Sequence, residues 1–342
     1  MDQIGVGVIG VGLMGSLFSK LASQLPDSVL VGVADIDESR ASVLGESLSV
    51  PAFADYNDLL ALPRLDAVVV ATPDAFHLQP ALAVAHARKH LMIEKPLATT
   101  LGDAIRIADT CKEMGVTLMV AHVLRFDPSY GEAFKAVRSG RLGEIVHVHL
   151  RRTTSIGDAQ RLAGRVTITF YLGSHSADVI QWIVGSPIVE VTAISTSNVM
   201  KEFNVDDTVM SLLRFENGAI GTLENSWIRP QGAGSRRLGA SLVMMGTEGA
   251  VKVDPFQECA SLYQHDYVEP ILPAYSFGET VFGGVGGIYR DEFAHFIQCV
   301  RTGVAPIVLP KQAISTVKVC GAIEQSIGQG KPVRIDQENV FT

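Results

Sequence analysis

The sequence predicts an α/β protein in which an N-terminal domain on a doubly wound parallel sheet precedes an α+β domain with a large, mostly antiparallel open sheet. Up to about residue 124, strand-like runs alternate with helix-like segments, which is typical of a parallel sheet with right-handed crossovers. After residue 125, several strands follow one another before the last helices, which is typical of an α+β domain. A glycine-rich turn joins the first strand to the first helix. We therefore expect domains at 1–124 and 125–342.

The N-terminal elements follow from apolar periodicity and from turn residues. The run at 65–71 is continuously apolar towards its end, as in a strand buried on both faces. Ligands of such a domain bind at the carboxyl ends of its strands. The predicted strands lie at 5–9, 28–34, 52–53, 65–71, 90–93 and 115–121, and the predicted helices at 13–24, 38–47, 55–61, 76–89 and 100–114.

The C-terminal elements have a different rhythm. Asn217-Gly218 separates two strand patterns and is a strong hairpin signal. No low-complexity linker separates the domains, so we expect them to pack, with the active site in the cleft between them. The predicted strands lie at 144–152, 189–197, 207–215, 219–227, 242–246, 251–253 and 333–335, the helices at 128–139, 174–184, 288–302 and 312–328, and a glycine-rich loop at 283–287.

Bulk composition excludes several classes of protein. The chain has 342 residues, 47% of them hydrophobic and 19% charged, which is an ordinary globular composition. The net charge of −8 disfavours nonspecific nucleic-acid binding. We expect no membrane span and no signal peptide. Four widely spaced cysteines show no disulfide framework, which favours a reducing cytoplasm.

The first strand, 5–9, leads into a G-x-G-x-x-G turn. The first glycine permits the tight turn, the second lets a pyrophosphate approach the main chain, and the third lets helix and strand pack closely. The alternative is a glycine-rich turn of any α/β protein, but the strand-to-helix context favours a dinucleotide-binding (Rossmann) domain. The candidate cofactor contacts in the turn are Gly10, Gly12, Leu13, Met14 and Gly15.

Asp35 ends the second strand, 20 residues after Gly15 by subtraction of their numbers. An acid at this spacing hydrogen-bonds the adenosine ribose of NAD. We therefore predict NAD, with Asp35 and Ile36 at the cofactor. Arg40 is also a candidate contact and keeps NADP open as an alternative, and Asp37 could share the ribose.

Two further strand ends carry polar residues that face the expected cofactor. Glu94 and Lys95 follow the strand 90–93, and Lys95 could donate a hydrogen bond to a substrate oxygen during hydride transfer. The alternative for Lys95 is a surface lysine in a loop. Thr72, Pro73 and His77 follow the strand 65–71 and are candidate cofactor contacts.

The segment that opens the helix 174–184 supplies the candidate base. His175 could accept a proton near neutral pH, and Asp178 lies one turn further on, within its reach. Tyr171 offers an active-site hydroxyl. The alternatives are a hydrogen-bonded core histidine and a core aromatic residue. His147 and His149 share a strand face, but they lack carboxylates or cysteines at ligand spacing, so no metal site is predicted.

These motifs together resemble the glucose–fructose oxidoreductase / inositol dehydrogenase / rhizopine-catabolism (Gfo/Idh/MocA) family. The resemblance runs along the whole chain, and the order and spacing of the motifs make it specific. The matching pieces are the glycine turn with Asp35, Ala71-Thr72-Pro73 with His77, Glu94-Lys95-Pro96, the segment 122–128, Gly173-Ser-His175-Ser-Ala-Asp178 and the helix that begins at Tyr289.

The resemblance implies an NAD(P)-dependent oxidoreductase acting on a secondary alcohol of a sugar, cyclitol or sugar derivative. It implies that Lys95 holds the reacting hydroxyl and that His175 takes its proton. Many relatives carry an aspartate where this chain has Tyr171, so Tyr171 becomes part of the catalytic set. The segment 122–128 makes His122 a substrate contact and Arg125 a cofactor contact. The resemblance further implies a homodimer or homotetramer formed through the open sheet.

Three functional hypotheses remain. The first is an NAD-dependent sugar or cyclitol dehydrogenase, with Lys95, His122, Arg152, Tyr171 and His175 at the substrate. The second is a sugar-nucleotide dehydrogenase, which needs cations for a diphosphate. The third is a non-catalytic NAD(P)-sensing regulator. The cations available to the second hypothesis are Arg151, Arg152, Arg161 and Arg165.

Overall fold

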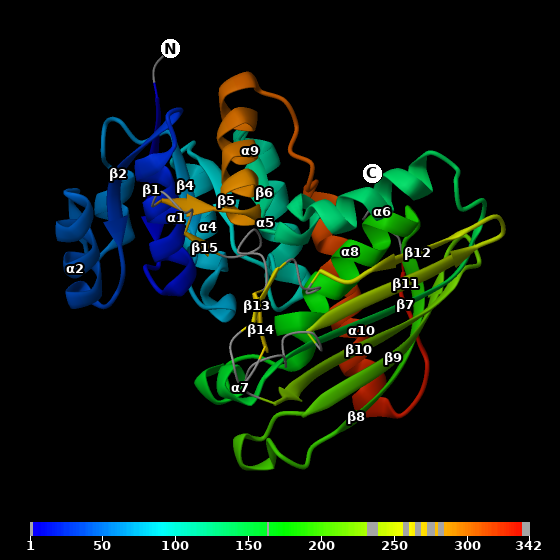
Figure 1. Cartoon of the computed structure of the whole chain (residues 1–342). Coiled ribbons are helices and arrows are strands. Elements are labelled where there is room, and N and C mark those ends of the chain that lie inside the picture. The colour runs from blue at the N-terminus through cyan, green and yellow to red at the C-terminus, as the bar shows by residue number, and fades with distance from the viewer. Residues whose placement is uncertain are drawn as a thin grey trace. The chain divides into compact units, whose positions relative to one another are not determined.

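The computed structural model describes residues 3–162, 164–230, 239–255, 260–263, 268–271, 278–279 and 284–336 (Figure 1). Contacts within the chain divide it into two compact units. The first unit comprises Met1–Val123 and Ala274–Ile314, and the second comprises Leu124–Pro273 and Ser315–Thr342.

The first unit is built on a six-stranded parallel sheet with the order β3-β2-β1-β4-β5-β6. The chain runs outward from β1 on one side and returns to β4 on the other, so the strand order switches direction between β1 and β4. This confirms the predicted doubly wound sheet. The strands are β1 (Ile4–Ile9), β2 (Ser28–Ala34), β3 (Ala52–Phe53), β4 (Ala67–Val70), β5 (His90–Ile93) and β6 (Leu118–Val120).

Three helices of this unit, α2, α3 and α5, begin at polar capping residues. The side chains of Asp37, Asp55 and Thr100 accept hydrogen bonds from N–H groups of the first turns that follow them. The predicted helix at 76–89 is shorter, because Pro80, which lacks an N–H, must fall in a first helical turn. The elements are α1 (Leu13–Gln24), α2 (Glu38–Leu48), α3 (Tyr56–Leu60), the 3-10 turn η1 (Asp74–Phe76), α4 (Leu78–His86) and α5 (Leu101–Met114).

A late segment of the chain returns to the first unit. It contains β15 (Gly278–Glu279), β16 (Val285–Gly286) and α9 (Ile288–Thr302). Val285 N donates to Gln24 Oε1 at 2.8 Å, and the rings of Phe293 and Phe18 lie 6.0 Å apart. The sequence indicated one boundary near residue 124, whereas these contacts assign Ala274–Ile314 to the first unit.

The second unit is built on a seven-stranded sheet with the order β12-β11-β7-β10-β9-β8-β17. β7 and β10 are parallel, and the other neighbours are antiparallel. The predicted large, mostly antiparallel sheet is thus confirmed. The strands are β7 (Ile145–Ser155), β8 (Ile188–Thr196), β9 (Thr208–Phe215), β10 (Ile220–Arg229), β11 (Ala240–Gly246), β12 (Ala250–Val253) and β17 (Val333–Arg334), with β13 (Ala260–Tyr263) and β14 (Val268–Ile271) forming a separate pair.

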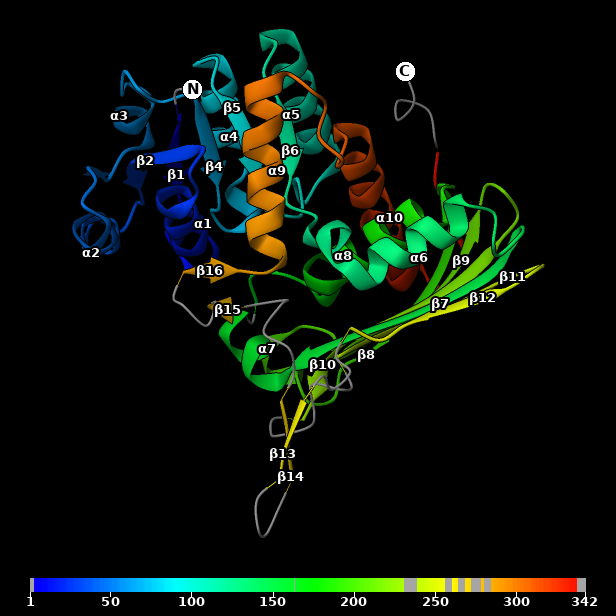
Figure 2. The ribbon, with the colours of Figure 1, turned by 45° about the horizontal axis from the view of Figure 1, so that its top comes forward.

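Helices cover one face of this second sheet (Figure 2). The side chains on the covered face, such as Val148, Leu150 and Leu213, are buried, whereas Met210 and Leu212 on the opposite face are 51% and 62% exposed. The alternation follows from the two-residue period of a strand. The helical elements are η2 (Val123–Phe126), α6 (Pro128–Arg138), α7 (Ile156–Leu162), the π-helix η3 (Thr169–Gly173), α8 (Ser174–Val184), η4 (Lys201–Phe203) and α10 (Pro310–Gln329).

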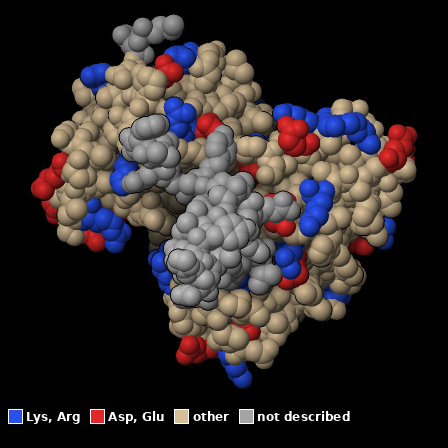
Figure 3. Space-filling model, viewed as in Figure 1, with Lys and Arg blue, Asp and Glu red and all other residues tan. Residues whose placement is uncertain are grey.

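Charged side chains are visible across one face of the molecule in the space-filling view (Figure 3). On the face shown in Figure 3, acidic and basic residues are interspersed rather than segregated by sign. Within the described part of the chain, no helix combines the length and apolar character that crossing a membrane requires.

Candidate active site

The turn between β1 and α1 has open space beside its middle glycine. A Cβ on Gly10, where φ is 85°, would lie 2.7 Å from Thr72 N, and a Cβ on Gly15 would lie 1.8 Å from Gly10 O. A Cβ on Gly12 would meet no atom within 4 Å. Gly10 and Gly15 are therefore needed for packing, whereas Gly12 borders free space at the N-terminus of α1. Helix N-termini bind phosphate, so this turn fits the pyrophosphate of a dinucleotide.

Asp35 is held rigidly beside the glycine turn. Its Oδ2 accepts from Val11 N at 2.8 Å, and its Oδ1 accepts from Asp37 N at 2.9 Å. The carboxylate is therefore fixed at the end of β2, where ribose recognition was expected. Ile36 is 96% exposed and leaves an apolar side chain at the same edge.

Arg40 lies between two carboxylates rather than pointing freely outward. Its Nη1 is 3.6 Å from Asp35 Oδ2, and its Nη2 is 3.3 Å from Asp37 Oδ2. A hydrogen bond from the Ser39 hydroxyl holds the pKa of Asp37 below its ordinary value. The local charge is therefore net negative, which disfavours a second phosphate on the ribose.

Lys95 is a half-buried residue among buried neighbours in the turn after β5. On one side of it, Glu94 N donates to Val70 O at 2.9 Å, and Lys95 N donates to Glu94 Oε2 at 3.1 Å. Burial raises the pKa of the Glu94 carboxyl to about 7, against the opposing effect of the Lys95 charge. Near neutral pH, the charge beside Lys95 therefore depends on the protonation of Glu94.

His77 is a buried residue between two loops of the first unit. Its side chain is 1% exposed, Nδ1 lies 2.9 Å from Pro96 O, and Nε2 lies 3.0 Å from Thr72 O. Both ring nitrogens face main-chain carbonyls, so the ring connects the two loops. The cofactor contact expected from the sequence stays a prediction.

Tyr171 and His175 share one side of a helical segment in the second unit. The π-helix η3 leads directly into α8, and π-helical turns occur frequently at functional sites. Tyr171 and His175 are half-buried, whereas residues 172–174 and 176–180 are all buried. The Tyr171 ring stacks on Trp227 with ring centroids 5.0 Å apart. The two predicted side chains are thus on the accessible side of this segment.

Asp178 has a partner that the sequence did not indicate. It accepts from Arg125 Nε at 2.9 Å and from Arg125 Nη2 at 2.6 Å, and both side chains are only 1% exposed. The Arg125 guanidinium also lies 5.7 Å from the Trp182 ring centre. The expected contact of Arg125 with the cofactor stays a prediction.

The other predicted substrate residues are buried. His122 is 1% exposed and Arg152 is 9% exposed. Arg152 Nη2 donates to the Tyr130 hydroxyl at 2.9 Å. Burial raises the pKa of Tyr130, so the phenol stays neutral. Nothing in the sequence signalled Tyr130 or Trp227, because their partners, Arg152 and Tyr171, are distant from them in the chain.

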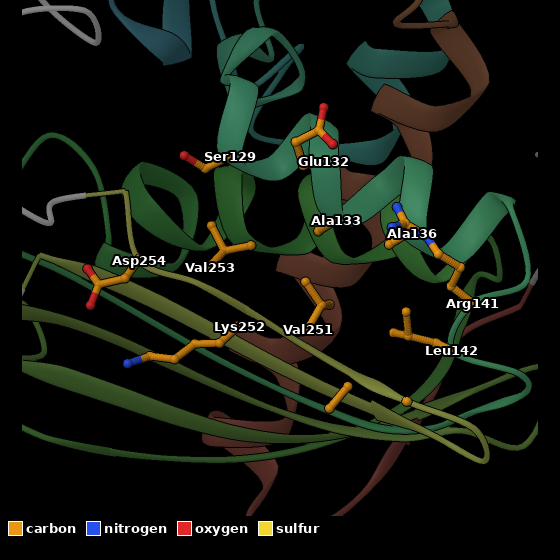
Figure 4. A pocket seen from close by; sticks show the side chains of 12 residues that line it. Ser129, Glu132, Ala133, Ala136, Arg141, Leu142, Val251, Lys252, Val253 and Asp254 are labelled. Carbon is orange, nitrogen blue, oxygen red and sulfur yellow. The ribbon is translucent and has the colours of Figure 1, made fainter.

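A cavity of about 620 Å³ lies between α6 and β12 of the second unit (Figure 4). Ser129 and Glu132 line it from the helix, and Lys252 and Asp254 line it from and just beyond the strand. None of the predicted site residues is among its lining residues. Across the described parts of both units, no three His, Cys, Asp or Glu side chains are grouped as metal ligands.

The structure gathers the predicted cofactor residues of the first unit at one edge of its sheet. The glycine turn, Asp35, Thr72 and Lys95 all follow the carboxyl ends of the neighbouring strands β1, β2, β4 and β5. This is the edge at which doubly wound sheets bind their ligands. Tyr171 and His175 belong to the second unit.

Two family profiles match this chain. The profile described as "Oxidoreductase family, NAD-binding Rossmann fold" matches residues 4–122, and the "GFO/IDH/MocA C-terminal domain" profile matches residues 130–252. The family assignment therefore rests on both matches, which follow each other along the chain, and not on one local motif.

Full-length relatives agree with the profiles. The chain is 27% identical over 348 residues to the scyllo-inositol 2-dehydrogenase (NAD(+)) of Bacillus subtilis, covering 99% of this chain and 98% of the relative. It is 27% identical over 341 residues to the D-xylose 1-dehydrogenase (NADP(+)) 2 of Haloferax volcanii, covering 96% and 99%. The crystal structure of myo-inositol 2-dehydrogenase from Lactobacillus plantarum shares the fold, with a TM-score of 0.86, 23% identity and coverage of 98% and 100%.

The comparisons confirm the predicted family, the NAD-binding Rossmann domain and the oxidoreductase class. They agree with the cofactor expected from the glycine turn and Asp35. The chain belongs to the Gfo/Idh/MocA family of oxidoreductases.

Proposed function

We propose that this protein is an NAD-dependent dehydrogenase that oxidises a secondary hydroxyl of a cyclitol or sugar. The observation that carries the proposal is the placement of the open space beside Gly12, the fixed Asp35 carboxylate and Lys95 along one sheet edge. The names of the full-length relatives, an inositol dehydrogenase and a xylose dehydrogenase, support a polyhydroxylated substrate.

In this proposal each protein residue has one task. The glycine turn and Asp35 would hold NAD, which when bound would supply the hydride acceptor. Lys95 donates a hydrogen bond to the reacting oxygen and stabilises its developing negative charge. His175 accepts the hydroxyl proton, and in the reverse direction it returns that proton. Tyr171 assists this proton transfer through its phenol, which can donate and accept hydrogen bonds.

The proposed cofactor preference rests on charge at the end of β2. Asp35 and Asp37 surround Arg40, so the 2′-phosphate of NADP would meet two carboxylates. The ribose hydroxyls of NAD instead find acceptor oxygens. We infer a preference for NAD, whereas NADP would require Arg40 to leave its carboxylate partners.

We also propose a homo-oligomer, dimer or tetramer, located in the cytoplasm. Five large apolar side chains are 40% to 70% exposed on the open face of the second sheet, and a second copy of this chain would cover them. Three free cysteines in the described part of the chain fit a reducing compartment. The exposed apolar residues of this face are Ile194, Met210, Leu212, Ile220 and Met245.

A substrate screen tests the proposed function. The purified protein is mixed with inositols, aldoses and sugar nucleotides, and NADH or NADPH formation is followed by absorbance with NAD and NADP in parallel. We expect turnover with a free cyclitol or sugar and NAD. Turnover confined to sugar nucleotides would contradict the proposed substrate, and NADP preference would contradict the role of Asp35. The absence of any turnover in the presence of bound NADH would favour a regulator.

A further inference from the structure

His77 lies where two loops of the first unit meet. One loop follows β4 and contains Thr72, and the other follows β5 and contains Lys95 and Pro96. The two strands are parallel neighbours, with Val70 opposite Ile93 at their carboxyl ends. His77 reaches both loops from the start of α4, whose first residue is Leu78.

The ring connects the two loops through their main chains. Nδ1 lies 2.9 Å from Pro96 O and Nε2 lies 3.0 Å from Thr72 O. A carbonyl oxygen only accepts hydrogen bonds, so the histidine must be the donor. Because the ring is 1% exposed, water does not compete for these carbonyls. Loss of the donor would leave a buried acceptor unsatisfied.

The protonation state decides how many donors the ring has. Burial lowers the pKa of His77, against the opposing charge of Asp74, so the ring is neutral at pH 7 and carries one N–H. The neutral ring then donates a hydrogen bond to one of the two carbonyls. An amide side chain at the same place would therefore restore a donor but not the rigid ring between the two loops.

The contact of His77 with the main chain is made at Pro96, the residue after Lys95. On its amino-terminal side, the Lys95 turn is already fixed by the hydrogen bond from Glu94 N to Val70 O. On its carboxyl side, the Pro96 carbonyl faces His77. We propose that His77 is a positioning residue that fixes the main chain after Lys95 and thereby sets the place of the Lys95 ammonium group. This inference rests on the proposed function of Lys95.

Two substitutions and a matched control test the inference. His77→Phe keeps a ring but has no donor, and His77→Gln supplies one amide donor. His86→Gln, on the exposed side of the same helix, is the control. Because a displacement of about 1 Å can cost about 100-fold in rate, we expect kcat to fall about 100-fold in His77→Phe and about tenfold in His77→Gln. The Kd for NADH should stay within about threefold of the wild type, since the glycine turn is untouched.

Hydrogen–deuterium exchange supplies a readout that does not depend on turnover. Peptides that span residues 94–99 should exchange faster in His77→Phe than in the wild type and in His86→Gln, while peptides from β1 stay unchanged. Unchanged kcat and unchanged exchange in His77→Phe would overturn the inference. A fall in kcat that matches the loss of NADH-binding capacity would also overturn it, because it would reflect unfolded protein. If the wild type oxidises no polyol, the proposed function fails, and exchange alone decides whether His77 ties the loops.

Discussion

The two units place their functional side chains in different ways. In the first unit, the glycine turn, Asp35 and Lys95 each follow a strand of one parallel sheet, so the sheet itself brings them to a common edge. In the second unit, Tyr171 and His175 sit on a largely buried helical segment that is fixed by distant partners. Trp227 stacks on Tyr171, and Arg125 pairs with Asp178 across 53 residues of sequence.

The difference shows where local sequence is sufficient. In a parallel sheet, residues that directly follow neighbouring strands lie close together, because all the carboxyl ends of the strands lie at one edge. A helix that packs on an open sheet gains its orientation from contacts that no local motif specifies. Substitutions at the strand ends of the first unit should therefore change catalysis directly, whereas substitutions of the buried charged pair Arg125–Asp178 in the second unit should act largely through stability.

The largest expected effect is on Lys95. Lys95→Met keeps the length of the side chain but removes the hydrogen-bond donor and the charge beside the reacting oxygen. We expect kcat to fall about 1000-fold, which is within the range for loss of one electrostatic group in an active site. Steady-state kinetics with the substrate from the screen measure it. Lys112→Met, at an exposed position on α5, is the control and should keep full activity.

A second test concerns the buried pair of the second unit. Asp178→Asn leaves the Arg125 guanidinium buried without its carboxylate, so the free energy of unfolding should fall by about 3 to 5 kcal/mol. Chemical denaturation monitored by tryptophan fluorescence measures the change. Because the Arg125 guanidinium is buried within this pair, we expect the KM for NAD to stay within about twofold in the folded fraction.

The double variant Arg125→Met with Asp178→Leu sharpens this result. It removes both charges together, so it should recover much of the stability lost in Asp178→Asn. If the KM for NAD rose strongly in the double variant although stability was recovered, Arg125 would be a cofactor contact, as its sequence motif had suggested. Arg125 would then act on the cofactor directly, as the strand-end residues of the first unit are expected to do, and not only through stability.

Much of the fold was accessible from the sequence. The alternation of apolar strands with helices predicted the doubly wound parallel sheet of the first unit, and Asn217-Gly218 predicted a hairpin in the second. The return of Ala274–Ile314 to the first unit was not predicted, because it depends on Phe293 meeting Phe18, two residues whose patterns are those of any amphipathic helix.

The candidate site was only partly accessible. The sequence placed Asp35 and Lys95 at the carboxyl edge of the first sheet because each follows a strand that the apolar pattern defines. It placed His77 near the same edge but could not show that both ring nitrogens face main-chain carbonyls. Helical spacing brought Asp178 near His175, but it could not reveal the bidentate pair with Arg125, which comes from a distant segment.

The third test uses the pH dependence of stability. The pKa of Glu94 is about 7 in the folded protein, above its ordinary value of 4.5. The folded state therefore binds more protons than the unfolded state in this window, and stability falls as pH rises through it. Relative to Glu94→Gln, the wild type should lose about 2 kcal/mol of unfolding free energy between pH 5 and pH 7. Denaturation curves at both pH values measure it.

The comparison of the wild type with Glu94→Gln isolates one carboxyl group. His77 and the other titrating residues are common to both proteins, so their contributions cancel in the difference. Parallel stability curves for the two proteins would show that Glu94 titrates normally, and the charge beside Lys95 would then be constant near neutral pH.

The smallest expected effect concerns the hydroxyl group of Tyr171. Tyr171→Phe keeps the stack on Trp227 and removes the hydroxyl. Loss of one hydrogen bond in the reaction should lower kcat about tenfold and leave the melting temperature within about 1 °C. Tyr171→Ala should lower both, since it also removes the ring. If Tyr171→Phe kept full kcat over the whole pH range, the phenol would have only a packing role, and His175 would carry the proton transfer without help from its neighbour one turn earlier.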